Sequence, residues 1–155
     1  MYLYLVQHAE ALAEEKDPKR PLSEKGKADI QKVAEFVSKY ANISIKSIIH
    51  SGKLRAEQTA EILAKYLNPP EGIRKEEGLN PLDDPLIWAN RLKEIEEDTM
   101  LVGHLPHLVK LSSYLLCQDM DKKIIEFQMG GVVCLRRDES NIWTVNWMII
   151  PELIK

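Results

Sequence analysis

The sequence contains little cysteine, glycine or proline and no long hydrophobic run. Its 155 residues include only two cysteines, Cys117 and Cys134, which excludes a disulfide framework and fits no metal-ligand spacing. Both thiols lie among apolar neighbours, so we expect them to be free and buried. The 7 glycines and 8 prolines exclude a collagen-like or low-complexity chain. The longest apolar candidates, 111–117 and 147–151, are too short for a membrane span of about 20 residues.

The chain also lacks a strong charge of either sign. Its 21 basic and 24 acidic side chains give a net charge of −3, so no global field attracts nucleic acid or a membrane surface. Any binding site for an anion must therefore be local. The N-terminal segment 1–6 has no basic region, and Gln7 and His8 interrupt it before a signal-peptide core can form, which predicts a cytoplasmic protein. With 45% hydrophobic and 29% charged residues, the composition predicts one globular domain, 1–155.

The first half of the sequence predicts two strand–helix units. Residues 2–6 have the composition of a buried strand, and a polar loop follows over 10–21. Ser23 is placed to cap the next helix, whose apolar positions recur at spacings of three and four. This spacing predicts a buried face made of Ile30, Val33, Ala34, Val37 and Tyr40. A second strand, 47–50, precedes a second helix, 53–67, which an Asn-Pro-Pro run ends.

The second half predicts two further units and a hairpin. In order, the elements are a strand over 72–76, a helix capped by Asp84 and running to about Glu97, a strand over 99–103, a helix over 106–117, and strands over 132–136 and 142–148. The helix over 106–117 is apolar nearly all round, so we expect it to be deeply buried. In the last two strands apolar and polar residues alternate, and a polar turn separates the strands, which is typical of an antiparallel hairpin. The sequence therefore predicts an α/β fold: a mixed, mostly parallel sheet with helices on both faces and a C-terminal antiparallel hairpin.

Polar side chains follow three of the predicted strands. His8 ends the first strand, Ser51 follows the second, and His104 ends the strand over 99–103. Arg55 lies in the opening turn of a helix, where backbone N–H groups already favour an anion. Ligands bind outside the carboxyl ends of the strands in open α/β sheets, so these four side chains are expected to meet at one edge. The expected site is a phosphate pocket.

Other polar residues have simpler interpretations. His50 also ends a strand, but it adjoins no second convergent group and is expected to be structural. His107 lies three residues after His104, a spacing that fits a metal site, but a third ligand is missing. We therefore expect no metal, and we expect His107 on the helix surface or at the rim of the pocket. Arg20, taken alone, is an ordinary solvated charge.

Four motifs occur in order along the chain: Leu5-Val-Gln-His-Ala-Glu10, Arg20-Pro-Leu-Ser-Glu-Lys-Gly26, His50-Ser-Gly-Lys-Leu-Arg-Ala-Glu-Gln-Thr59 and Val102-Gly-His-Leu-Pro106. Together they resemble the signatures of the histidine phosphatase superfamily, and in particular its small SixA-type phosphohistidine phosphatases. The resemblance extends over about 2–147 and implies a phosphoglycerate mutase-like sandwich without the lid insertions of longer members.

The resemblance implies a role for each matching residue. His8 corresponds to the nucleophilic histidine that takes the phosphoryl group and yields a phosphoenzyme, which water then hydrolyses. Arg55 and His104 would hold the phosphoryl oxygens, Arg20 resembles the additional arginine of SixA-like members, and Ser51 would donate a further hydrogen bond. Neutral imidazole is nucleophilic near pH 7 because its reference pKa is about 6.5. This scheme needs neither a metal nor a cofactor.

The sequence departs from the family pattern at the first motif. The family has Arg-His-Gly where this chain has Gln7, His8 and Ala9, which removes one guanidinium from the phosphate site. A glutamine amide at this position can still donate a neutral hydrogen bond to a phosphoryl oxygen. We therefore expect weaker phosphate binding than an arginine would give.

A second departure concerns the general acid. Gly78 stands where many members have an acidic residue, and the sequence does not choose among the neighbouring carboxylates of Glu76, Glu77, Asp83 and Asp84. Expelling an alkoxide needs a proton, whereas phosphohistidine expels imidazole, whose conjugate acid has a pKa of about 6.5. The missing acid therefore favours a phosphoramidate substrate.

Three functions follow from these observations. The first is a metal-independent phosphatase acting on phosphohistidine in a protein, such as a histidine phosphotransfer domain of a phosphorelay. The second is a phosphomonoesterase for a small phosphorylated substrate, which would use one of the loop carboxylates as its acid. The third is a phosphoprotein-binding module that lost turnover because Gln7 replaced the arginine.

Overall fold

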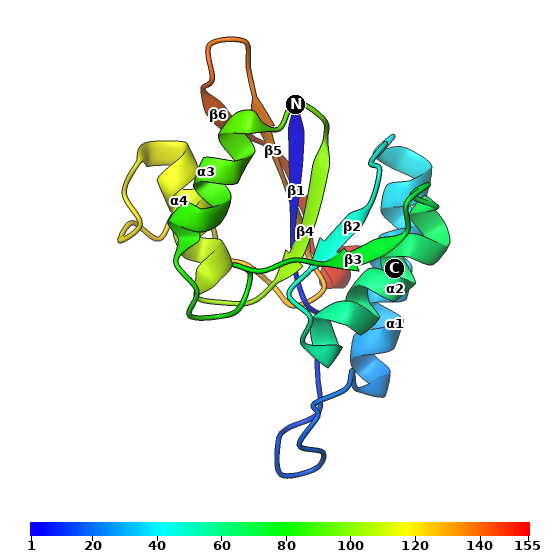
Figure 1. The fold of residues 1–155 in the computed structure, drawn as a ribbon. Coiled ribbons are helices and arrows are strands. Elements are labelled where there is room, and N and C mark those ends of the chain that lie inside the picture. Colours follow the sequence, from blue (N-terminus) through cyan, green and yellow to red (C-terminus); the bar gives the residue numbers. More distant parts are fainter.

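One six-stranded sheet forms the middle layer of the computed structural model, which describes residues 1–155 (Figure 1). The strand order is β3-β2-β4-β1-β5-β6. The elements are β1 (Tyr2–Gln7), α1 (Glu24–Tyr40), β2 (Ile48–His50), α2 (Leu54–Leu67), β3 (Ile73–Lys75), α3 (Pro85–Glu94), β4 (Thr99–Gly103), α4 (His107–Cys117), β5 (Val132–Arg137), β6 (Trp143–Ile149) and a short 3-10 turn, Pro151–Leu153.

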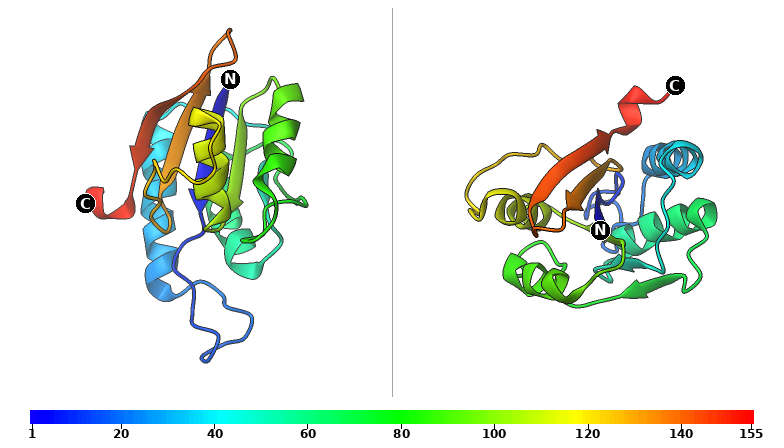
Figure 2. Two further views of the ribbon diagram at one scale, coloured as in Figure 1. Left: turned by 90° about the vertical axis from the view of Figure 1, so that its left-hand side faces the viewer. Right: turned by 90° about the horizontal axis from the view of Figure 1, so that it is seen from above.

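The sheet is mixed, as the sequence predicts. Strands β3, β2, β4 and β1 are parallel, while β5 pairs antiparallel with β1, and β6 pairs antiparallel with β5. Helices α1 and α2 cover one face of the sheet, and α3 and α4 cover the other (Figure 2). None of these helices combines the length and the apolar content needed to cross a membrane.

Two hydrophobic cores lie back to back across the central strands. Along β1, Leu3 and Leu5 point to the side of α3 and α4, whereas Tyr4 and Val6 point to the side of α1 and α2. This is the two-residue alternation of a strand that is buried on both faces. Because β1 and β4 are central and covered on both sides, the residues that follow their carboxyl ends have firmly fixed positions.

Four sequence-based expectations about this architecture are wrong. Tyr40 is 73% exposed rather than buried, because it occupies the last position of α1 and its ring packs on Phe36 at the surface. Cys117 is exposed at the end of α4, and only one side of that helix is deeply buried. Helix α3 ends at Glu94 instead of Glu97 because the guanidinium of Arg137 binds backbone carbonyls at its C-terminus.

The loop between β1 and α1 is fastened to the first turn of that helix. The Ser23 amide donates to the Glu10 carbonyl (2.9 Å), and the Ser23 hydroxyl donates to the Glu10 carboxylate (2.8 Å). The Ser23 hydroxyl oxygen also caps α1 by accepting from the amide of Gly26 (3.0 Å). Gly26 allows the loop to lie this close, because a Cβ at this position would overlap the Glu10 carbonyl oxygen.

Replacing Gly26 with alanine should therefore destabilise the protein. In an unconstrained helix interior, a change from glycine to alanine is stabilising by about 0.5–1 kcal/mol. Here the added methyl meets backbone, so we expect the free energy of unfolding to fall by about 1–3 kcal/mol, the usual cost of overpacking. Urea unfolding of Gly26→Ala beside the parent chain measures the sign. A variant more stable than the parent would show that the loop does not press on α1.

Candidate active site

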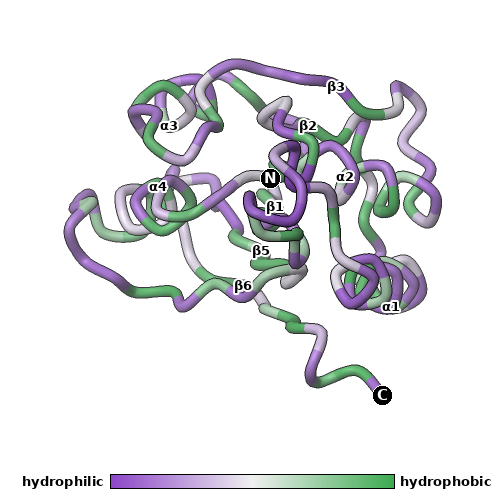
Figure 3. Tube along the Cα trace, turned by 90° about the horizontal axis from the view of Figure 1, so that it is seen from below, coloured by the Kyte–Doolittle hydropathy of each residue, from purple (hydrophilic) through white to green (hydrophobic).

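The side chains expected to form a phosphate pocket meet at the carboxyl edge of the parallel strands. His8 follows β1, His104 follows β4 and Ser51 follows β2. The His8 amide donates to the Gly103 carbonyl (3.0 Å), so the two histidines stand side by side with ring centroids 5.1 Å apart. Figure 3 views this pole from below, with α3 and α4 on one side of the strands and α1 and α2 on the other. The predicted convergence is thus present in the fold.

The ring of His8 has a defined orientation. Its Nδ1 lies 2.7 Å from the Ala9 carbonyl oxygen. A carbonyl only accepts hydrogen bonds, so Nδ1 carries the proton and Nε2 keeps its lone pair. Burial lowers the pKa of His8 to about 4, with a smaller contribution in the same direction from the charges of Arg55 and Arg20, while the Ala9 carbonyl opposes it. At neutral pH, His8 is therefore an uncharged imidazole with a free Nε2.

His104 is paired with the serine that follows β2. A hydrogen bond of 2.6 Å joins Ser51 Oγ to His104 Nε2, and Ser51 Oγ also accepts from the amide of Lys53 (3.3 Å). Burial lowers the pKa of His104 to about 3, and the nearby side chains of His8 and Arg55 act in the same direction. Its buried Nδ1 has no hydrogen-bond partner. Ser51 therefore fixes the orientation of the His104 ring.

Two guanidinium groups approach the histidines. Arg55 lies in the first turn of α2, and its buried Nε has no hydrogen-bond partner. Arg20 comes from the loop before α1, where it adopts a positive φ of 50° and donates from Nε to the Leu12 carbonyl (3.1 Å). Burial and the charge of Arg20 lower the pKa of Arg55. Neither guanidinium forms an ion pair with a carboxylate, so the pocket has uncompensated positive charge that an anion would neutralise.

The two residues that depart from the family pattern lie on either side of His8. Gln7 pairs with Gly103 in the sheet, its carbonyl accepts from the Gly130 amide (3.0 Å), and its half-exposed side-chain amide has no partner within the chain. Ala9 is fully buried in the core on the side of α1 and α2. The methyl group of Ala9 therefore packs against the core, while the Gln7 amide is free to contact a ligand.

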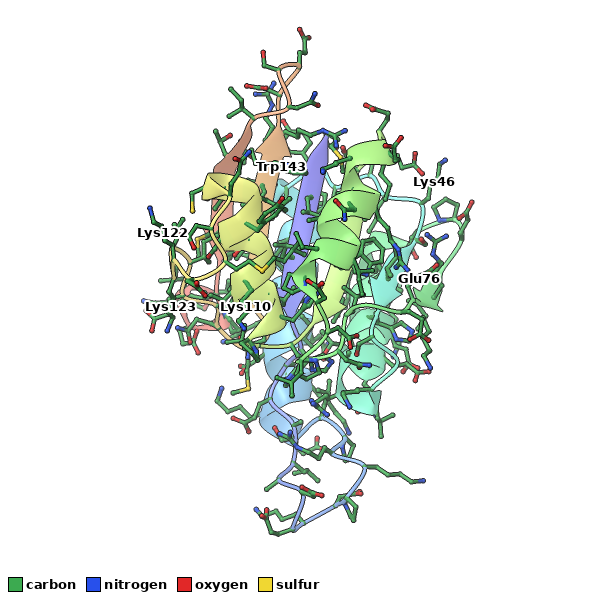
Figure 4. All side chains as sticks on the ribbon, turned by 60° about the vertical axis from the view of Figure 1, so that its left-hand side comes forward. Lys46, Glu76, Lys110, Lys122, Lys123 and Trp143 are labelled. Carbon is green, nitrogen blue, oxygen red and sulfur yellow. The ribbon has the colours of Figure 1, made fainter.

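None of the four candidate acids forms a hydrogen bond with the histidines or arginines of the pocket. Glu76 pairs with Arg74 (3.4 Å) and lies at the outer edge of the molecule beside β3 (Figure 4). The carboxylates of Asp83 and Asp84 accept from the backbone amides of Asn80 and Leu86, and Asp84 caps α3. The remaining candidate, Glu77, is exposed. These carboxylates are engaged elsewhere or face solvent.

The structure corrects the expectation for His107. Its side chain is fully buried instead of lying on the helix surface or at the rim, and neither ring nitrogen has a hydrogen-bond partner. Burial lowers the pKa of His107, although the charges of Asp83 and Asp84 act in the opposite direction. His107 faces inward because it begins α4 beneath the loop that carries Asp83. The i, i+3 spacing alone did not show which side of the helix this loop covers.

His50 has the structural position expected for it. Its Nδ1 accepts a hydrogen bond from the Gly52 amide (3.1 Å) and so holds the turn after β2. Burial lowers its pKa as well. No group of three or more histidine, cysteine, aspartate or glutamate side chains is arranged to hold a metal ion.

A profile of the histidine phosphatase superfamily (branch 1) matches residues 3–99. The chain belongs to this superfamily. It is 27% identical over 159 residues to phosphohistidine phosphatase SixA of Escherichia coli strain K12, with 97% of this chain and 94% of the relative covered. A solved structure of the protein histidine phosphatase SixA complexed with tungstate has a TM-score of 0.86 and 26% identity, and both chains are covered completely.

A more distant structure shares the fold alone. The alpha-ribazole phosphatase from Shigella flexneri has a TM-score of 0.78 and 14% identity, with 97% of each chain covered. The phosphoglycerate mutase-like architecture implied by the motifs is thus confirmed by the SixA structure, with its sheet and four main helices matched over the whole chain.

The buried histidines predict how stability depends on pH. Burial lowers the pKa of all four histidines in the folded state, whereas in the unfolded chain it is about 6.5. Below pH 6.5 the unfolded chain binds protons that the folded chain does not, so the free energy of unfolding should fall as the pH is lowered from 7 to 5. Each histidine contributes a slope of up to about 1.4 kcal/mol per pH unit.

Urea unfolding at several pH values tests this dependence. His107→Leu is the matched variant, because it removes one buried histidine outside the candidate site. We expect its stability to vary less steeply with pH than that of the parent. A parent chain equally stable at pH 7 and pH 5 would contradict the assignment of neutral buried histidines.

Proposed function

We propose that this chain is a metal-independent phosphatase that works through a phosphohistidine intermediate on His8 and removes phosphoryl groups from phosphohistidine in a protein. The observation that carries the proposal is the hydrogen bond from His8 Nδ1 to the Ala9 carbonyl. It leaves Nε2 as a free nucleophile in a pocket that contains two unpaired guanidinium groups, those of Arg20 and Arg55.

The reaction takes place in two displacements. In the first, His8 Nε2 attacks phosphorus, a bond from Nε2 to phosphorus forms, and the phosphorus–nitrogen bond of the substrate breaks to release its imidazole. In the second, water attacks phosphorus, the bond to His8 breaks, and phosphate leaves. Phosphorylation makes the His8 ring cationic while Nδ1 keeps its proton. The Ala9 carbonyl accepts a hydrogen bond from Nδ1 and so stabilises this charge.

The remaining pocket residues act on the phosphoryl oxygens. Arg55 and Arg20 supply fixed positive charge and forked donors, which suit a planar transition state with charge spread over three oxygens. Ser51 and His104 share one proton in their own hydrogen bond, and when His104 Nε2 donates in that bond the Ser51 hydroxyl keeps its proton for a phosphoryl oxygen. In this assignment, catalysis consists of positioning and charge neutralisation.

The leaving group favours a phosphoramidate. An alkoxide needs a proton from a general acid, yet no candidate carboxylate hydrogen bonds to the pocket residues. Imidazole that carries a proton on its other nitrogen leaves as a neutral molecule and needs no such acid. The relative from Escherichia coli is itself a phosphohistidine phosphatase, which supports a phosphorylated histidine side chain, such as that of a histidine phosphotransfer domain, as the substrate.

Rapid-quench labelling tests the nucleophile. Mixing the protein with a ³²P-phosphohistidine protein should trap label that is stable in base and lost in acid, because a phosphoramidate behaves in this way. His8→Ala should abolish both labelling and turnover. His50→Ala is the matched control, because His50 is a buried histidine that holds a turn and should leave a labelled enzyme.

The same assay separates the alternative functions. Turnover of a sugar phosphate faster than of the phosphohistidine protein would favour a small-molecule phosphomonoesterase. Tight binding of the phosphoprotein without label or turnover would favour a binding module. Activity should survive a strong chelator; loss on chelation that zinc restores would contradict the metal-independent scheme.

Gln7 provides a second test of the pocket. Gln7→Arg would replace a neutral amide with a guanidinium next to the phosphoryl site. Hydrogen bonds to charged groups contribute about 1.5–3 kcal/mol, so vanadate should bind about ten- to a hundred-fold more tightly to the variant. Calorimetric titration of both proteins measures the affinity. Weaker binding together with a lower melting temperature would show that arginine is buried there without a partner and that Gln7 does not line the pocket.

A further inference from the structure

Helix α2 contacts two of the other segments that carry pocket residues, those of His8 and Arg20. Thr59 Oγ1 accepts a hydrogen bond from the amide of Ala9 (3.0 Å), the residue after His8. Its neighbour Gln58 accepts through Oε1 from the amide of Leu22 (2.8 Å), which lies just after Arg20. The same helix carries Arg55 in its first turn. Adjacent residues of one helix thus hold the backbone beside the histidine and the backbone beside the second arginine.

The Thr59 hydroxyl is fully used by these contacts. It donates its single proton to the Arg55 carbonyl (2.7 Å), one helical turn earlier, and it is completely buried. The oxygen is therefore oriented with a lone pair toward the Ala9 amide. A threonine that bonds back to the preceding turn of its own helix is common. The Thr59 hydroxyl also accepts a hydrogen bond from the Ala9 amide, which belongs to a separate segment. Thr59 thus connects the Arg55 backbone with the backbone that follows His8.

This constraint extends to the imidazole ring. Ala9 is held at its amide by Thr59 and presents its carbonyl to His8 Nδ1 (2.7 Å). A shift of Ala9 away from α2 would move that carbonyl and break its hydrogen bond with the proton on Nδ1. The ring could then take the other tautomer, in which Nε2 carries the proton and has no lone pair for attack.

Gln58 makes the corresponding contact with the arginine loop. Its acceptor fixes Leu22, whose side chain is buried, and Arg20 lies two residues earlier at a positive φ of 50°. Burial lowers the pKa of Arg55, and the like charge of Arg20 acts in the same direction, so the two guanidinium groups repel each other while no anion is bound. An attachment of the loop to α2 opposes this repulsion.

We infer that Thr59 and Gln58 are positioning residues: Thr59 sets the tautomer and place of His8 through Ala9, and Gln58 sets the distance of Arg20 from Arg55. The inference rests on the proposed function, since it concerns the same pocket. It adds that the separation of the nucleophile and both cations is defined by one helix, α2. Removing the Thr59 contact should therefore disturb the tautomer of His8, and removing the Gln58 contact should weaken anion binding.

The Thr59 contact is tested with variants that differ in the hydroxyl. Thr59→Val keeps the shape of the side chain and removes the hydroxyl, whereas Thr59→Ser keeps it. For Thr59→Val, ¹⁵N NMR should show the proton of His8 moving from Nδ1 toward a mixture of tautomers. Phosphoenzyme formation at saturating donor should slow by about a hundred-fold, a usual cost of misplacing a reacting group by about 1 Å. Thr59→Ser should restore both.

An unchanged tautomer and rate in folded Thr59→Val would overturn the role of Thr59. If that variant does not fold, Thr59→Ala replaces it, and Thr59→Ser and Thr59→Ala then form the pair that differs only in the hydroxyl. Equal spectra and rates for this pair would overturn the role equally. The NMR spectrum requires no substrate, so a protein that fails to hydrolyse phosphohistidine would contradict the proposed function without affecting this result.

The Gln58 contact is tested through vanadate affinity. Gln58→Leu removes the acceptor, so we expect vanadate to bind about ten-fold more weakly while His8 keeps its proton on Nδ1. If Gln58 acts through Arg20, Gln58→Leu should have little further effect when Arg20→Ala is already present. If Gln58→Leu weakens vanadate binding equally with and without Arg20→Ala, Gln58 does not act through Arg20. An unchanged vanadate affinity in Gln58→Leu alone would also overturn the role of Gln58.

Discussion

The hydrogen bond from His8 Nδ1 to the Ala9 carbonyl is the interaction on which the proposed chemistry depends. An imidazole has two nitrogens, and only the one without a proton can attack phosphorus. By accepting from Nδ1, the carbonyl reserves Nε2 for the ligand. Burial contributes the second condition, because it lowers the pKa of His8 and keeps the ring neutral. Geometry and desolvation therefore act together at a single side chain.

The same pocket is electrostatically unfavourable without a ligand. Arg55 and Arg20 have no carboxylate partner, and the pKa of His104 is lowered further by the charges around it. Partly buried unpaired charge costs stability, and the fold offsets that cost with two hydrophobic cores on opposite faces of the sheet. In the proposed function, an incoming phosphoryl group supplies the missing negative charge. A bound anion would neutralise the positive charge of this pocket, as a carboxylate does in a site with an internal ion pair.

Precise placement of the pocket depends on close backbone contacts far from the reacting atoms. Glu10 lies against the first turn of α1, where Ser23 donates to it and Gly26 leaves room for it. On the other side, α2 holds the segments next to His8 and Arg20 through Thr59 and Gln58. The loop from the first strand is thus fixed by two helices. Side chains on it keep their positions even though much of the loop is polar.

Much of this architecture follows from local sequence patterns. Strand alternation, the cap at Ser23 and the polar residues after the strands predict a mixed sheet with His8, Ser51, Arg55 and His104 at one edge. The strands, the helix cap and the polar residues at the strand ends depend on neighbours within a few residues, and the rule that ligands bind at the carboxyl ends of parallel strands then predicts where the site lies. Contacts between distant segments decided the rest: the burial of His107 beneath a loop, and the end of α3 at carbonyls bound by Arg137. The hydrogen-bond partners of Thr59 and Gln58 were also decided by tertiary structure. They lie 50 and 36 residues away in the sequence, and a contact at such a separation produces no periodic pattern that could predict it.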